Sequence, residues 1–191
     1  MAPAKLAGSV RGYMRLPIRG FGLLELMITI ALLAILAGIA LPSFQTTIRS
    51  NRVTTATNNL LAAINQARGE AVTRARPVTV CAASSDRSTC SSSTAGWDTN
   101  GWLIVCTNAA GTTAEACTTG DEDEALLRVF EPGTQVEITT TVTRLTFDRR
   151  GAVPAQVDFA LEPDGCSGTQ RRELQVSIMG RARSLQKSCT T

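Results

Sequence analysis

The hydrophobic pattern opens with one long apolar run, residues 21–41, that contains a single charge, Glu25. At about 1.5 Å rise per residue, a helix of this length spans the ~30 Å hydrocarbon core of a bilayer. The segment before the run contains no acidic residue and four basic ones, Lys5, Arg11, Arg15 and Arg19. Because positively charged flanks stay in the cytoplasm, the pattern predicts a membrane helix with the rest of the chain on the far side.

Residues 43–76 continue with a helical period. Their apolar positions recur at spacings near three or four residues: Phe44, Ile48, Leu60, Leu61, Ile64, Ala67, Ala71 and Val72. This spacing predicts an amphipathic helix whose apolar stripe packs on a sheet. The Thr- and Asn-rich stretch 50–59 is its weakest part and is expected to fray. Pro77 disfavours helical backbone at Arg76, so the helix is expected to end there.

After Pro77 the pattern changes to a period of two and to short apolar runs, which predict strands. We expect long polar loops at 84–100 and 108–124, with Trp97 and Trp102 as anchors in the core or the loop. The expected strands are 77–83, 102–107, 125–130, 135–140, 142–147, 156–161, 171–179 and 181–186, the last two forming a hairpin that turns near Gly180. A long N-terminal helix followed by an antiparallel β domain is an α+β fold.

The six cysteines all follow the apolar run: Cys81, Cys90, Cys106, Cys117, Cys166 and Cys189. An even number in an oxidising compartment favours disulfides, but six cysteines allow 15 pairings and the sequence alone does not choose. We favour the nearest-neighbour set, because each bond would then close a loop rich in turn residues: Cys81–Cys90, Cys106–Cys117 and Cys166–Cys189. A zinc site is the competing interpretation, which the lack of CxxC pairs and of histidine disfavours.

The formal net charge of +3 misrepresents most of the chain. Residues 1–20 contain four of the 19 basic residues, so the remainder has 15 basic against 16 acidic residues. Residues 166–191 are strongly basic, whereas Asp121–Glu124 is an acidic run, most simply a solvated loop because its spacing fits no calcium-binding pattern. Without histidine, Ser-His and Cys-His nucleophile arrangements are excluded, and we expect neither an enzyme nor a cofactor.

Gly20, Phe21 and Glu25 stand at the spacing of the class III signal of type IV pilins and type II secretion pseudopilins, which this segment resembles. The resemblance implies cleavage between Gly20 and Phe21 by prepilin peptidase. Glu25 would then pair, in the fibre core, with the free amino group of Phe21 in a neighbouring subunit. Gly22 departs from the threonine usual in pilins, and a start at Met14 instead of Met1 would give a leader of more usual length. A plain membrane anchor with Glu25 near the interface is the alternative.

Features of the rest of the chain resemble the GspH/FimT family: Gly101–Val105, the Phe147–Gly151 turn, and a segment between Cys166 and Cys189 that carries the sequence GRAR. The resemblance implies a type IV pilin-like fold with other major and minor pilins as partners. Four parts follow: a cleaved leader (1–20), a helix for the inner membrane and the fibre core (21–42), an amphipathic helix (43–76), and a periplasmic β domain with disulfides (77–191).

The GRxR turn resembles that of FimT minor pilins, which implies a type IV pilus component that binds DNA during uptake for natural transformation. Arg181 and Arg183 match the DNA-contacting arginines and Gly180 matches the turn. Two residues apart on a strand, these arginines would project from one face about 6.6 Å apart, and each could meet a phosphate. We add Lys187, Arg171 and Arg172 on electrostatic grounds alone.

Binding of this kind is expected to be independent of DNA sequence and dependent on salt, because the hairpin has no aromatic residue for stacking and would contact phosphates. An ordinary solvated hairpin face is the simpler interpretation of the same arginines. The alternative function is that of a GspH-like minor pseudopilin of the type II secretion system, a structural tip component without DNA binding. A pilus-initiating minor pilin without a ligand is a third.

Overall fold

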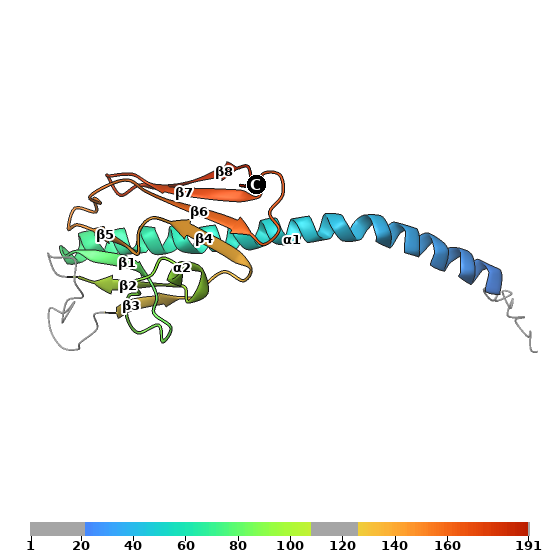
Figure 1. The fold of residues 1–191 in the computed structure, drawn as a ribbon, viewed down its shortest axis with the longest axis horizontal. Helices are drawn as coiled ribbons and strands as arrows, with labels where there is room; N and C mark the ends of the chain where they lie inside the picture. Colours follow the sequence, from blue (N-terminus) through green and yellow to red (C-terminus); the bar gives the residue numbers. More distant parts are fainter. Residues whose placement is uncertain (1–21, 108–125, 191) are drawn as a thin grey trace, which may run out of the picture. The chain divides into compact units, whose positions relative to one another are not determined.

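A computed structural model describes residues 22–107 and 126–190 of the chain (Figure 1). The chain divides into two compact units, Met1–Pro42 and Ser43–Thr191, and the long helix α1 (Leu23–Arg74) contributes to both. In the first unit, the side chains of residues 22–39 are exposed. Within the described residues, α1 is the one helix long and apolar enough to cross a membrane, in keeping with the predicted membrane segment.

In the second unit, α1 is amphipathic as predicted. Its buried stripe recurs at helical spacing and consists of Val53, Ala56, Leu60, Ala63, Ile64, Ala67 and Ala71. Four residues that the sequence pattern assigned to the stripe are outside it: Phe44 is 64% exposed, Val72 is 52% exposed, and Ile48 and Leu61 are half-buried. Phe44 lies beyond the buried stretch, which begins at Val53. Val72 follows the buried Ala71 by one position and therefore lies about 100° around the helix from it.

The stretch 50–59, which was expected to fray, is regular helix. The hydroxyl of Thr54 donates to the Ser50 carbonyl (2.8 Å), and that of Thr57 donates to the Val53 carbonyl (2.7 Å). These bonds inside the helix satisfy the hydroxyls that would otherwise favour non-helical backbone. Burial of Val53 then stabilises the turn that propensity alone disfavours.

Helix α1 ends at Arg74, two residues earlier than predicted. The N–H of Arg76 donates to the Ala71 carbonyl (3.2 Å), and the N–H of Ala75 donates to the Val72 carbonyl (3.3 Å). This pair of bonds is a Schellman cap, in which the residue after the helix adopts positive φ. Here that residue is an alanine, with φ of 52°.

Two four-stranded antiparallel sheets follow, which confirms the predicted α+β fold. The first has the order β3-β2-β1-β5, with β1 (Val78–Ala82), β2 (Trp102–Cys106), β3 (Leu126–Phe130) and β5 (Arg144–Phe147). The second has the order β4-β6-β7-β8, with β4 (Val136–Thr140), β6 (Val157–Pro163), β7 (Arg171–Val176) and β8 (Ala182–Lys187). Strands β7 and β8 form the predicted terminal hairpin.

The segment 84–100, which was predicted to be a loop, contains one short helix, α2 (Gly96–Thr99). It buries Trp97, whose indole N–H donates to the Val142 carbonyl (2.9 Å) and whose ring meets Phe159 edge-on at 5.1 Å between centroids. Trp102 is equally buried and stacks on Phe130. Both tryptophans are thus core anchors, as predicted.

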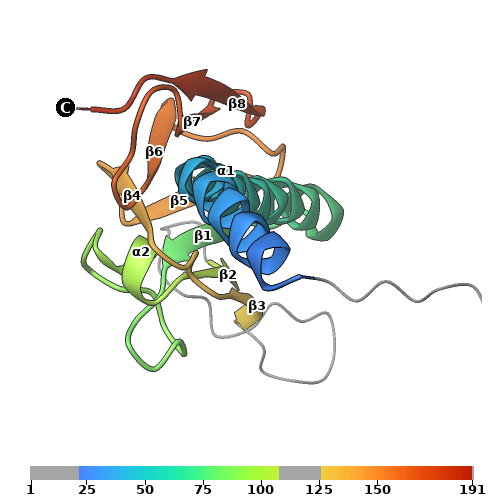
Figure 2. The same cartoon turned by 90° about the vertical axis from the view of Figure 1, so that its right-hand side faces the viewer.

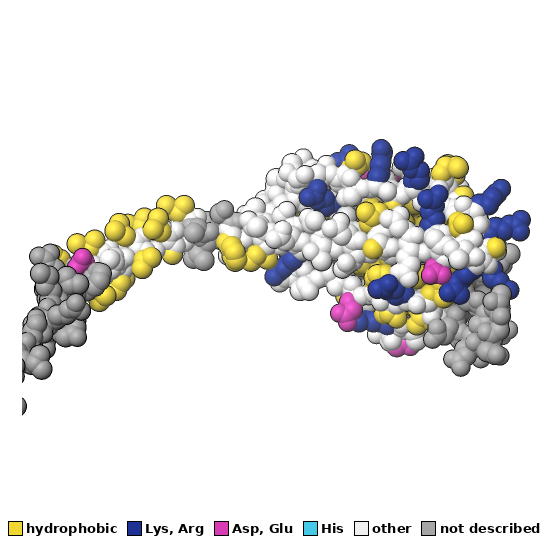
Figure 3. Space-filling model, turned by 180° about the vertical axis from the view of Figure 1, so that it is seen from behind, with side chains coloured by type: hydrophobic (Ala, Val, Ile, Leu, Met, Phe, Trp, Pro, Cys, Tyr) yellow, Lys and Arg dark blue, Asp and Glu magenta, His cyan; other side chains and the backbone are white. Residues whose placement is uncertain are grey.

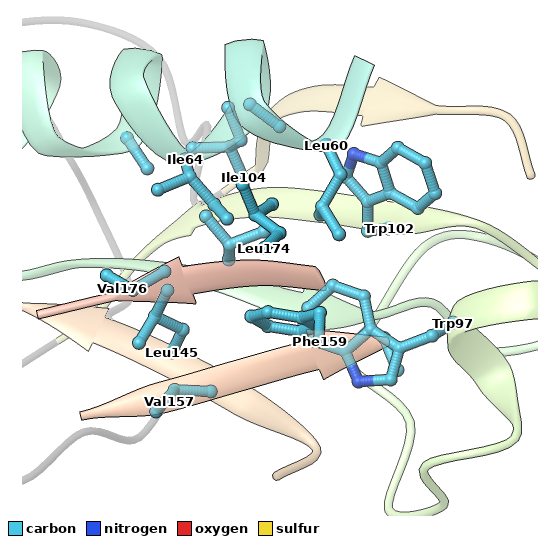
Figure 4. Packing of buried hydrophobic residues seen from close by; sticks show 14 of the residues in the cluster. Leu60, Ile64, Trp97, Trp102, Ile104, Leu145, Val157, Phe159, Leu174 and Val176 are labelled. Atoms are coloured by element: carbon cyan, nitrogen blue, oxygen red, sulfur yellow. The ribbon is translucent and has the colours of Figure 1, made fainter. Parts of the chain in front are cut away.

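The core lies where the second part of α1 packs against both sheets (Figure 2). Leu60 and Ile64 of the helix face Ile104 of β2 and Leu174 of β7 (Figure 4). Every residue of this main cluster falls between Val53 and Val176, so the second unit holds its own hydrophobic core.

Two of the predicted disulfides are present, Cys81–Cys90 and Cys166–Cys189, each between cysteines near in sequence. Cys106 is also disulfide-bonded, and its predicted partner, Cys117, lies outside the described residues.

Candidate nucleic-acid interface

The β7–β8 hairpin closes through a tight turn at residues 177–181. The N–H of Gly180 donates to the Ser177 carbonyl (2.7 Å), and the N–H of Ser177 donates to the Arg181 carbonyl (3.0 Å). Gly180 has φ of 71°, a left-handed conformation that glycine adopts without steric cost. A Cβ there would lie 1.9 Å from the carbonyl oxygen of Gly151. The turn role that the family resemblance implies for Gly180 therefore has a steric basis.

The structure brings Arg181 and Arg183 together, as predicted from their spacing. Both are exposed, and with Gln156 and Gln175 they line one surface hollow of about 310 Å³. The amide oxygen of Gln175 accepts from Nε (3.0 Å) and Nη2 (2.6 Å) of Arg183. The Arg181 side chain makes no hydrogen bond or ion pair with residues 22–107 or 126–190. The hollow thus has one guanidinium held in place and one that extends into solvent.

The three basic residues added on electrostatic grounds do not join this pair. Nη1 of Arg171 forms an ion pair with Oε1 of Glu162 (3.2 Å), and both side chains are about one-fifth exposed. Nζ of Lys187 lies 4.0 Å from Oε2 of Glu173. Arg172 points to the face of β7 opposite to that of Arg171, because side chains alternate along a strand. Arg171 and Lys187 are thus largely neutralised by nearby carboxylates.

Arg171 meets Glu162 because β6 pairs with β7, whereas Lys187 meets Glu173 across the hairpin itself. The β6–β7 pairing also puts Asp158 opposite Gln175. The net charge of residues 166–191 therefore overstated how basic the surface of the β7–β8 hairpin is, because carboxylates lie next to two of its basic residues. The acidic run Asp121–Glu124 lies outside the described residues.

Three more arginines lie near Gly180, and the sequence analysis assigned none of them to the site. Nε of Arg68, on α1, donates to the Gly151 carbonyl (3.1 Å) and lies 3.0 Å from where a Cβ of Gly180 would be. Arg149 and Arg150 are exposed in the turn before Gly151. Figure 3 shows basic side chains gathered on this face of the globular part. The sequence shows Arg149 and Arg150 in a turn that ends at Gly151, but it does not show that this turn lies near Gly180.

Asp148 shapes the turn that carries Arg149 and Arg150. Its Oδ1 accepts from the backbone N–H of Ala152 (2.9 Å) and of Arg150 (2.8 Å), and its Oδ2 lies 3.3 Å from Nε of Arg150. The N–H of Ala152 in particular, with that of Arg150 and its guanidinium, holds the pKa of the Asp148 carboxyl below its ordinary value. The carboxylate therefore stays ionised and keeps the turn closed at any pH near neutral.

The predicted assembly residues are only partly covered by the structure. Glu25 lies exposed in the first turn of α1, whereas Gly20 and Phe21 lie outside the described residues. No group of three or more metal-ligating side chains occurs in the part of the chain that the structure describes.

Comparison with known proteins adds independent findings. Residues 56–180 match the family model for type II transport protein GspH, and residues 16–41 match the prokaryotic N-terminal methylation motif. The fold is similar to the type IV minor pilin FimU of Pseudomonas aeruginosa in two crystal forms, at 22% identity. One match covers 73% of this chain and 96% of FimU with a TM-score of 0.52, and the other covers 72% and 99% with a TM-score of 0.50. No curated protein sequence matches significantly.

Proposed function

The chain belongs to the GspH family, and on that premise we propose that it is a FimT-like minor pilin of the type IV pilus that binds DNA during uptake for natural transformation. The observation that carries the proposal is the pair Arg181 and Arg183, exposed beside one hollow on a turn that Gly180 fixes sterically. The methylation motif supports assembly into a fibre with other pilins.

Binding would use the two guanidiniums as phosphate contacts. A guanidinium forms charge-assisted, planar hydrogen bonds with phosphate oxygens, which a lysine cannot reproduce. Gln175 accepts hydrogen bonds from Nε and Nη2 of Arg183, which fixes the orientation of this guanidinium before DNA binds. The side chain of Arg181 can adapt its position. Phosphate contacts carry no base information, so DNA of any sequence would bind.

Assembly would follow the pilin scheme. Prepilin peptidase would cleave after Gly20, the apolar part of α1 would hold the subunit in the inner membrane, and the β domain would face the periplasm. In the fibre, Glu25 would pair with the N-terminal amino group of Phe21 in a neighbour. One subunit with two phosphate contacts binds DNA weakly, and several subunits in one fibre would raise the apparent affinity by avidity.

The first test is a DNA titration with the full chain in a non-ionic detergent. Labelled duplex is titrated at several salt concentrations beside Arg181→Gln/Arg183→Gln. We expect the wild-type affinity to fall steeply with salt, and the variant to bind at least tenfold more weakly with a log–log salt slope reduced by about 2, since each lost phosphate contact removes about one unit.

The matched control is Arg87→Gln/Arg128→Gln, which removes the same charge from other parts of the domain. It should leave binding within about twofold, because a specific site and not net charge is responsible. Equal weakening in both variants, or full binding in the hairpin variant, would contradict the assignment of the site.

One observation favours a second function, that of a GspH-like pseudopilin in type II secretion. The Arg171–Glu162 and Lys187–Glu173 pairs make the outer face of the second sheet mixed in charge, which suits a protein interface better than a polyanion. Deletion of the gene separates the two. Loss of exoprotein secretion with transformation intact would favour the pseudopilin, and the reverse would favour the DNA-uptake pilin.

A further inference from the structure

Two turns with the same backbone design occur in the domain. One connects β5 to β6 at residues 148–152, and the other connects β7 to β8 at residues 177–181. In each, the N–H of the glycine donates to the carbonyl of the first residue (2.8 and 2.7 Å), and the N–H of that first residue donates to the carbonyl of the last (2.8 and 3.0 Å). The glycines, Gly151 and Gly180, have φ of 76° and 71°. Both are three-residue loops closed by a glycine bulge.

The two turns are held against each other. The Gly151 carbonyl lies so close to Gly180 that a Cβ would not fit between them, and Arg68 donates to the same carbonyl from α1 (3.1 Å). The N–H of Val153, just after the first turn, donates to the Ile178 carbonyl at the tip of the second (2.9 Å). Since backbone contacts between the two turns and the Arg68 side chain of α1 fix this junction, the twin turns (residues 148–152 and 177–181) form one rigid surface.

The tips of the twin turns differ in chemistry. The first presents Arg149 and Arg150, both exposed. The second presents Ile178 and Met179, which are 57% and 68% exposed. Turns favour polar residues and glycine, and neither apolar side chain is needed for this backbone geometry. Two large apolar side chains at an exposed tip therefore indicate a contact surface for a ligand that is both anionic and apolar, because four exposed arginines lie on or next to the twin turns: Arg149, Arg150, Arg181 and Arg183.

We propose that the twin turns bind DNA at unpaired or unstacked bases, with Arg149 and Arg181 on phosphates and Ile178 and Met179 against the exposed base faces. The inference rests on the proposed function and names the form of DNA that the site prefers. Bases expose their apolar faces only where stacking is broken, and aliphatic side chains such as Ile and Met contact or wedge between them in architectural DNA-binding proteins.

An anionic lipid surface has related chemistry but fits the tip less well. The apolar part of α1 already suffices as a membrane anchor, and two further side chains would add little apolar area to it. A DNA strand, by contrast, repeats one phosphate and one base per nucleotide, which matches a cationic turn directly beside an apolar one.

The test compares three labelled DNAs of equal length with the full chain in non-ionic detergent: a duplex, the same duplex with a three-nucleotide bulge, and a single strand. The tip variant is Ile178→Ser/Met179→Ser, and its control is Val129→Ser, an exposed apolar residue of β3. We expect wild type to bind the bulged and single-stranded DNA about tenfold more tightly than the duplex, because the bases there are already unstacked. The tip variant should lose this preference and bind all three like duplex, while Val129→Ser keeps it.

The outcomes separate this inference from the proposed function. Wild-type binding that depends on Arg181 and Arg183 but is equal for all three DNAs would overturn the inference and leave the function intact. A preference that the tip variant retains would overturn it as well. No binding to any DNA would overturn both. Tip-dependent binding to phosphatidylglycerol vesicles, with DNA binding unaffected by the tip variant, would assign the surface to lipid instead.

Discussion

At the scale of single residues, Gly180 occupies a position where one methyl group would meet backbone on another strand connection. We expect Gly180→Ala to lower the free energy of unfolding by about 2–4 kcal/mol, because a left-handed conformation costs an L-residue about 1–2 kcal/mol and the clash with Gly151 adds to it. Guanidinium denaturation of the oxidised protein measures this. DNA binding should weaken too, since Arg181 follows directly.

Gly168→Ala separates the two causes of this loss. Gly168 has nearly the same φ, 65°, but nothing lies within 4 Å of the position of its Cβ. We expect a loss of about 1–2 kcal/mol from conformation alone, with DNA binding unchanged. If the two alanine variants unfold at the same denaturant concentration, close packing of the turns is not what requires Gly180.

The sequence identified the residues of the hairpin better than their partners. Arg181 and Arg183 could be paired from their spacing because a strand repeats every two residues. The ion pairs of Arg171 and Lys187 could not be foreseen in the same way. Glu173 lies on the neighbouring strand of the hairpin, and Glu162 comes from β6, whose place beside β7 is decided by packing of the whole domain.

At the scale of elements, the end of α1 carries a residue that conformational energy disfavours. Ala75 sits at the left-handed position of the Schellman cap, where glycine is usual. We expect Ala75→Gly to raise the free energy of unfolding by about 0.5–1 kcal/mol, because the relief of strain exceeds the entropy that glycine adds to the unfolded chain. Urea or guanidinium midpoints with an unchanged m-value would show it. Gly69→Ala, inside the helix and in open space, is the matched control and should also stabilise.

Element types and approximate boundaries were predictable because each depends on local pattern. The stripe Leu60, Ile64, Ala67 and Ala71 indicated α1, and the run Trp102–Cys106 indicated a buried strand. The exposure of Phe44 was not predictable, since periodicity gives the face of a helix but not how far a sheet extends along it. Helix α2 was missed because four residues are too few to show a period.

At the scale of the whole molecule, the nearness of the two turns is the feature furthest beyond sequence reasoning. Gly151 and Gly180 are separated along the chain by β6 and β7, and their contact depends on both strands ending at one edge of the domain. The near-neighbour disulfides are the opposite case. Cys81–Cys90 closes a short loop rich in turn residues, and this local feature favoured the pairing before the fold was known.

The two units of the molecule are expected to serve separable roles, and Glu25→Ala tests this. A carboxylate in the bilayer costs roughly 2.5–3.5 kcal/mol, so alanine should favour residence of the unassembled subunit in the membrane. The same change removes the proposed partner of the Phe21 amino group and should therefore disfavour assembly. We expect the variant to accumulate, processed, in the membrane fraction and to be at least tenfold depleted from sheared fibres in immunoblots.

Thr29→Ala, one turn further along α1, should assemble normally. Solubilised Glu25→Ala should bind DNA with wild-type affinity, because the arginine hairpin lies entirely in the second unit. Normal incorporation into fibres would show that Glu25 is a tolerated charge in a plain anchor and that assembly depends on other contacts.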